Sequence, residues 1–105
     1  MFEEVCARQL QHPGVTMGRA LSQPGLMTGG KLFAFLLPDG RFVVKVPAAR
    51  MAELVATGVG APMTMGRRTM RQWVAVAGRE PEWDGLADEA RLYVESLAAR
   101  PARGR

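Results

Sequence analysis

The chain has 105 residues, of which 48% are hydrophobic and 23% charged, and its formal net charge is +4. This length supports a single hydrophobic core and excludes a deep cleft between two domains. The single cysteine, Cys6, excludes an intramolecular disulfide, and no apolar run approaches the roughly 18 residues that predict a membrane span.

The amino-terminal residues predict a helix followed by a weak strand. Apolar side chains recur at helical spacing over residues 2–11, and Pro13 and Gly14 then end the pattern. Residues 15–21 are a candidate first strand, although apolar and polar side chains alternate poorly along them. This start opens with acidic rather than basic side chains, unlike a signal peptide, and favours a cytoplasmic protein.

Two tight turns predict a meander of strands in the first half of the chain. The pair Gly29-Gly30 separates two apolar runs and supplies the positive φ angles of a hairpin turn. A second turn at residues 38–40 leads into a strand at residues 41–46. In that strand one face carries Phe42, Val44 and Val46, and the other carries Val43 and Lys45. This alternation is typical of a half-buried antiparallel strand.

The second half of the chain predicts helix, loop, strand and helix. Pro47 fits the first turn of a helix that Gly58 closes, and we expect residues 58–62 to form a loop. Residues 70–77 predict a strand. Asp84 is a candidate N-cap for a final amphipathic helix. The apolar seam of that helix consists of Leu86, Ala90, Tyr93 and Leu97.

This order of elements predicts an α+β fold. We expect a two-layer sandwich in which a mainly antiparallel sheet of about five strands carries its helices on one face, in the order α-β-β-β-α-β(β)-α. Residues 1–100 form one domain in this interpretation, and residues 101–105 form a disordered tail.

Four segments resemble the N-terminal domain of TfoX/Sxy proteins over roughly residues 15–97. They are GKLFAFL at 30–36, VVKVP at 43–47, RMAELVATGVG at 50–60 and MRQWVAV at 70–76. The resemblance implies a small α/β layer pair like that of YjbR-type and secretion-chaperone-like domains. Full-length members add a C-terminal helical domain and are associated with transcriptional regulation of natural competence. The resemblance implies no catalytic residues.

The chain lacks the usual combinations of catalytic or metal-binding residues. Cys6 and His12 are the only residues of their types and form no recognised ligand set, so we expect Cys6 to be a core residue. Most acids surround the start of the last helix, where the helix dipole favours them. We therefore predict a non-enzymatic domain without metal or cofactor that acts through protein–protein or regulatory interactions, including self-association through a sheet edge or face.

Positive charge is concentrated in the middle of the chain. Residues 31–79 carry eight bases and two acids. The candidate contacts for nucleic acid or another anion are Lys45, Arg67, Arg68, Arg71 and Trp73, because guanidinium groups bind phosphates and an indole stacks on a base. Direct nucleic-acid binding is thus one alternative function. Another is a small-molecule pocket between the sheet and the helices.

Overall fold

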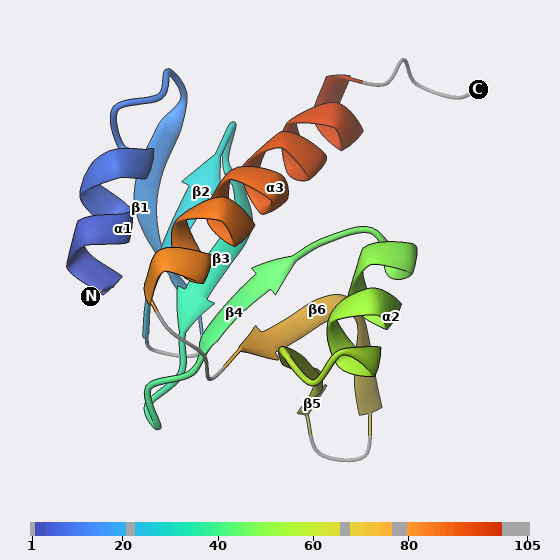
Figure 1. Cartoon of the computed structure of the whole chain (residues 1–105). Coiled ribbons are helices and arrows are strands. Elements are labelled where there is room, and N and C mark those ends of the chain that lie inside the picture. Colours follow the sequence, from blue (N-terminus) through green and yellow to red (C-terminus); the bar gives the residue numbers. More distant parts are fainter. Residues whose placement is uncertain (1, 21–22, 66–67, 77–79, 100–105) are drawn as a thin grey trace.

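The computed structural model describes residues 2–20, 23–65, 68–76 and 80–99 (Figure 1). The predicted tail at 101–105 and Arg67 lie outside these residues. In chain order the elements are α1 (Phe2–Gln9), β1 (Val15–Ala20), β2 (Gln23–Thr28), β3 (Lys31–Leu36), β4 (Phe42–Lys45), α2 (Ala48–Ala56), β5 (Gly60–Met65), β6 (Arg68–Val76) and α3 (Glu80–Ala99).

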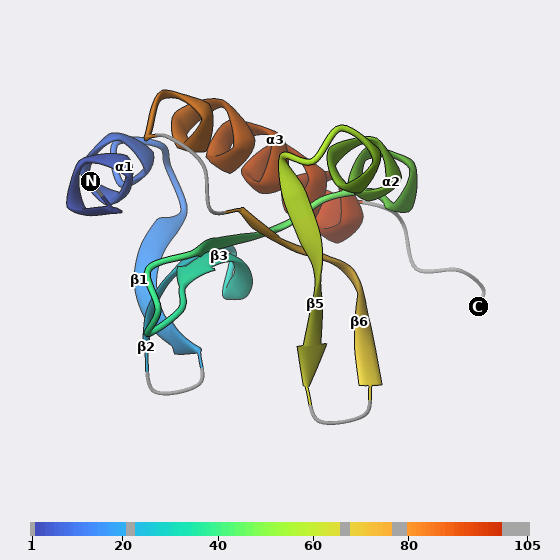
Figure 2. The same cartoon turned by 60° about the horizontal axis from the view of Figure 1, so that its bottom comes forward.

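The described strands form one antiparallel sheet in the order β1-β2-β3-β4-β6-β5. Figure 2 shows the three helices on one side of this sheet, while the β1–β2 and β5–β6 hairpins extend away from them. The predicted α+β sandwich is therefore confirmed, with six strands in the described part of the chain instead of about five. No helix of the described residues has the length and apolarity needed to cross a bilayer.

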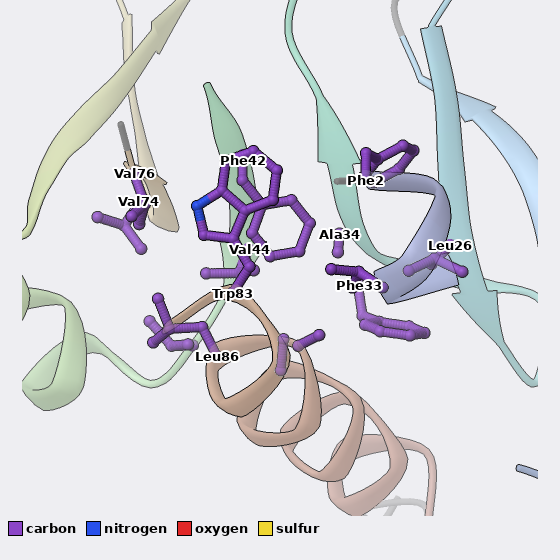
Figure 3. Close-up of a cluster of buried hydrophobic side chains, with 14 of the residues drawn as sticks. Phe2, Leu26, Phe33, Ala34, Phe42, Val44, Val74, Val76, Trp83 and Leu86 are labelled. Atoms are coloured by element: carbon purple, nitrogen blue, oxygen red, sulfur yellow. The ribbon is translucent and has the colours of Figure 1, made fainter. Parts of the chain in front are cut away.

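A ring stack under α3 forms the centre of the helix-side core (Figure 3). The indole of Trp83 lies on the ring of Phe42 with centroids 4.9 Å apart and an interplanar angle of 20°. Phe2 of α1 meets the same Phe42 ring at 6.0 Å. Because Phe42, Val44 and Val46 are all fully buried in this core, the predicted alternation of β4 is confirmed.

A smaller apolar cluster lies on the opposite face of the sheet, away from the helices. We call it the lower cluster, and its members are Phe35, Leu37, Val43, Met63 and Ala75, with Leu32 and Trp73 packed against it. All of these residues belong to β3, β4, β5, β6 or the turn after β3. Both faces of the central strands are thus apolar, although the described helices cover only one of them.

The predicted loop at residues 58–62 is wrong, because β5 begins at Gly60. A Cβ atom on Gly60 would lie 2.5 Å from Cγ2 of Val74, so this glycine allows close approach of β5 to β6. Pro62 then fits because β5 is an edge strand, where the missing N–H removes no ladder bond on the solvent side. Glycine and proline here mark a tightly packed edge rather than a loop.

The predicted N-cap at Asp84 is also wrong, because α3 begins at Glu80. Pro81 lies in the first turn, where proline is tolerated. The extra turn carries Trp83, whose stacking on Phe42 stabilises it. The Asp84 carboxylate instead pairs with Arg8 of α1, with Nη2 and Oδ2 2.7 Å apart.

A buried guanidinium joins α1, β2 and α3. Arg91 is 8% exposed, and its Nε donates to Oε1 of Gln9 over 3.0 Å. The Gln9 amide donates to Asp88 over 2.8 Å, while the Thr28 hydroxyl donates to Glu95 over 2.9 Å. Arg91 lies 3.5 Å from the carboxylates of both acids. These polar contacts connect three elements around a single cation.

We expect Arg91→Met to lower the free energy of unfolding by about 2–3 kcal/mol, because it removes the cation between two carboxylates and leaves Gln9 without its donor. The measurement is urea denaturation followed by circular dichroism. The neighbouring Leu92 is 57% exposed, so Leu92→Gln is the control and should change stability by less than about 0.5 kcal/mol. Equal effects of the two substitutions would contradict a stabilising network.

The free thiol of Cys6 is buried in α1, as predicted. Desolvation by burial, followed by the nearby Glu3 carboxylate, raises the pKa of Cys6 from 9.0 to about 11. The unfolded thiol therefore ionises first as the pH rises. Its contribution to stability is complete below pH 9 and is lost between about pH 9 and pH 11.

We expect Cys6 to react with iodoacetamide at pH 8 far more slowly in the folded protein than in guanidinium chloride, because burial and the raised pKa both suppress the thiolate. Mass spectrometry measures the modified fraction. The stability of Cys6→Ala should also fall less steeply than that of the wild type above pH 9. Labelling at equal rates in both states would show that the thiol is accessible.

Candidate functional site

Strands β3 and β4 separate at one end, and this opening creates the candidate site. Their pairing runs from Leu36–Phe42 to Ala34–Val44. Beyond it, Leu32 pairs back with β2, whereas β4 continues beside β6. Figure 1 shows the two strands spreading apart, with the C-terminal half of α3 crossing over the opening. The sheet therefore has a gap in its pairing below this helix.

A groove with a cavity volume of about 410 Å³ lies at this opening. Its described lining is Lys31, Leu32, Lys45, Trp73, Val94 and Leu97. We call it the β3–β4 groove. The volume falls within the range of about 300–1,000 Å³ that is typical of small-molecule sites, and the combination of apolar walls with a few polar groups is also typical of them.

The groove carries two lysines whose charges are not neutralised by the described residues. Neither Lys31 nor Lys45 forms an ion pair there. Glu95 is next to the lining residue Val94, but its carboxylate already contacts Thr28 and Arg91. The resulting local charge is positive and favours an anion.

Lys45 and Trp73 form a cross-strand pair between β4 and β6. The Nζ atom of Lys45 lies 5.7 Å from the centroid of the Trp73 ring, which is a cation–π distance. Phe35 meets the same indole at 5.6 Å with an interplanar angle of 55°. The half-buried Trp73 is therefore held between a cation and a second ring on the face away from the helices.

An irregularity in β6 positions Trp73. Pro62 pairs with Val74, but the next residue of β5, Met63, pairs with Met70, so three residues of β6 lie between these partners. One of them, Gln72, has a φ of 69°, in the left-handed region that non-glycine residues seldom adopt. Its carbonyl accepts a hydrogen bond from the Val46 amide over 2.9 Å. Such bulges redirect side chains near functional sites.

A second hollow, of about 270 Å³, lies between α2 and α3. It contains Arg50, which binds Glu89 through two hydrogen bonds of 2.8 and 3.1 Å. Hydrogen bonds to Glu89, then to Glu53, raise the pKa of Arg50 above its usual value. Because this guanidinium is already paired, the second hollow is less suited to binding an anion than the β3–β4 groove is.

The structure brings together two of the five predicted contact residues, Lys45 and Trp73. The side chains of Arg68 and Arg71, like Arg67, lie outside the described residues, so their predicted role is untested. The predicted contacts did not include four of the described lining residues, which are Lys31, Leu32, Val94 and Leu97. The Gly29-Gly30 turn predicted the strand that begins at Lys31, and apolar periodicity predicted the last helix. No sequence signal indicated that β3 and β4 separate.

Among the described residues, no group of three or more His, Cys, Asp or Glu side chains is arranged to hold a metal ion. Neither protein-family models, nor curated proteins, nor solved structures gave a match to this chain. The TfoX/Sxy assignment therefore stays a prediction from sequence motifs. The geometry of the β3–β4 groove remains the basis for a functional proposal.

We expect Gln72→Gly to be at least about 1 kcal/mol more stable than Gln72→Val, because a β-branched residue is strained at positive φ and glycine is not. Thermal and urea denaturation measure the difference. The control is Thr16, an exposed residue of the regular strand β1, where the order should reverse and valine should be the more stable. Valine more stable than glycine at both positions would contradict a strained bulge.

Proposed function

We propose that this chain is a non-enzymatic binding domain that takes an anionic ligand with an apolar body in the β3–β4 groove. The observation that carries this proposal is the placement of Lys31 and Lys45 on a groove that also has apolar walls. Two ammonium groups bind and orient a negative charge. Leucine, valine and tryptophan side chains remove an apolar body from water.

The two kinds of contact contribute differently to binding. Half-exposed ion pairs are worth about 0–1 kcal/mol each, whereas apolar burial is worth about 25 cal/mol for every Å² removed from water. The apolar walls therefore supply most of the affinity. The lysines supply the preference for an anion over a neutral molecule, because no acid among the described residues competes for them.

We further propose that this binding serves a regulatory interaction, on the basis of the resemblance to TfoX/Sxy proteins. The separation of apolar residues into a helix-side core and a lower cluster supports this role. A ligand at the opening would touch Val94 of the helix-side core as well as Leu32 and Trp73, which pack against the lower cluster. Its occupancy would thus affect the surface that the sheet presents to a partner protein.

Direct nucleic-acid binding is a weaker alternative for the same residues. Lys45 and Trp73 have the chemistry of a single-strand contact. However, Trp73 is only half-exposed, and both Lys45 and Phe35 already contact its ring. A small molecule suits a groove of about 410 Å³ better than a base stacked on that indole does.

We expect organic anions to bind at this groove in ¹⁵N-edited NMR titrations of the full chain. The probes are octanoate, 2-naphthoate and phenyl phosphate, each compared with the neutral molecule 1-octanol or 2-naphthol. At least one anion should shift the groove amides at concentrations where its neutral counterpart does not. Those amides belong to Leu32, Lys45, Trp73, Val94 and Leu97.

The double variant Lys31→Met/Lys45→Met should weaken the binding of that anion by about three- to thirtyfold, because it removes two ion pairs of up to about 1 kcal/mol each. Its matched control is Arg19→Met/Arg41→Met, which removes the same charge from residues that do not line the groove. Equal weakening by both double variants would indicate a general charge effect and would contradict the site. An oligo-dT that binds tightly, with a steep loss of affinity in salt, would favour the nucleic-acid alternative.

A further inference from the structure

We infer that the ligand of the β3–β4 groove is an aliphatic carboxylate, a flexible hydrocarbon chain with a single anionic head. This inference rests on the proposed function and narrows it to one class of small molecule. The groups that the structure places along the groove distinguish a flexible chain from a flat aromatic ring.

The walls of the groove are mainly aliphatic and come from different layers. Val94 belongs to the helix-side core, and Leu97 lies one turn further along α3. Leu32 packs against the lower cluster on the opposite face of the sheet. The groove thus connects the two faces of the sheet through the opening between β3 and β4. A flexible chain can follow such a path, whereas a rigid ring system needs a flat slot.

The one aromatic wall is already engaged within the protein. The Lys45 ammonium lies over the Trp73 ring, and Phe35 packs at an angle against the same indole. A ligand ring stacked on Trp73 would compete with these contacts. An alkyl chain needs no stacking on the indole, so it binds without displacing the cation.

The anionic head of the ligand needs no bidentate partner. The described lining offers lysines, which act as point charges, and no guanidinium fork of the kind that favours bidentate phosphate binding. Arg50 of α2 is held by Glu89 at the other hollow. A carboxylate at Lys31 or Lys45 satisfies this chemistry.

The test is a chain-length series on the full chain. Dissociation constants for hexanoate, octanoate and decanoate are measured by NMR titration below their micelle concentrations. Each added pair of methylenes should tighten binding about fifteenfold until the groove is filled, because every buried methylene contributes about 0.8 kcal/mol. 2-Naphthoate should bind at least tenfold more weakly than decanoate.

Two substitutions separate chain burial from ring stacking. Trp73→Leu keeps an apolar wall, so it should change decanoate affinity by less than about threefold, whereas a stacked ring would lose its platform. Leu97→Asn places an amide in the wall and should reduce the gain per methylene. Leu92→Asn is its control, because Leu92 is exposed on the same helix and does not line the groove. Urea denaturation of each variant confirms that it is folded.

The outcomes distinguish the inference from the proposed function. If 2-naphthoate binds tightly and Trp73→Leu abolishes this binding, the inference of an aliphatic ligand is overturned, while the proposed anion site is retained. A series without chain-length dependence would also overturn it. If no anion shifts the groove amides, both proposals fail. If the protein sediments with anionic vesicles and this depends on Lys31 and Lys45, the ligand is a membrane lipid rather than a free carboxylate. That result would overturn the inference.

Discussion

One helix crosses the end of the sheet at which β3 and β4 separate, and this constraint shapes the molecule. A helix of 20 residues such as α3 spans about 30 Å. Its N-terminal half is fastened over β4 by the stack of Trp83 on Phe42. Its C-terminal half reaches β2, where Glu95 accepts a hydrogen bond from Thr28. The lining residues Val94 and Leu97 lie on either side of this second attachment, so the position of α3 over the groove follows from how the helix is held.

The positive charge of the groove results from how the acids of α3 are used. Asp84 pairs with Arg8 of α1, and Glu89 pairs with Arg50 of α2. Asp88 and Glu95 surround Arg91. The first two pairs hold α3 to α1 and α2, whereas the contacts of Arg91 lie within α3, and none of them involves Lys31 or Lys45. The domain is stabilised by its helix-side ion pairs, and the strand lysines remain available because the acids are engaged elsewhere.

The sequence predicts the regular parts of this fold well. Alternation along residues 41–46 assigned Phe42 and Val43 to opposite faces, and both assignments are confirmed. Local signals failed where a tertiary contact decides the structure. Gly60 resembles a loop residue until the close approach of Val74 is known, and the N-terminal start of α3 depends on Phe42, which is distant in sequence. Side-chain periodicity carries no information on such distant partners.

The same limit explains why only part of the site was predicted. Lys45 and Trp73 were predicted from their chemistry, a central positive charge and an indole, and both lie in segments whose strand character the sequence shows. Leu32 and Val94 were missed, since their approach depends on the point at which β3 leaves β4, and pairing register is a property of two strands rather than of one. A buried arginine in an apolar seam, such as Arg91, is likewise evident only from the partners that surround it.

The strained bulge in β6 helps to form the groove. A regular β5–β6 hairpin would continue from the Pro62–Val74 pair and place residue 73 opposite Met63. The three inserted residues instead let Met63 pair with Met70, so that β5 passes by Trp73 while β4 still pairs with it through Lys45. A left-handed residue such as Gln72 costs about 1–3 kcal/mol. That cost is offset by a geometry that places Trp73 on the groove with the Lys45 ammonium over its ring.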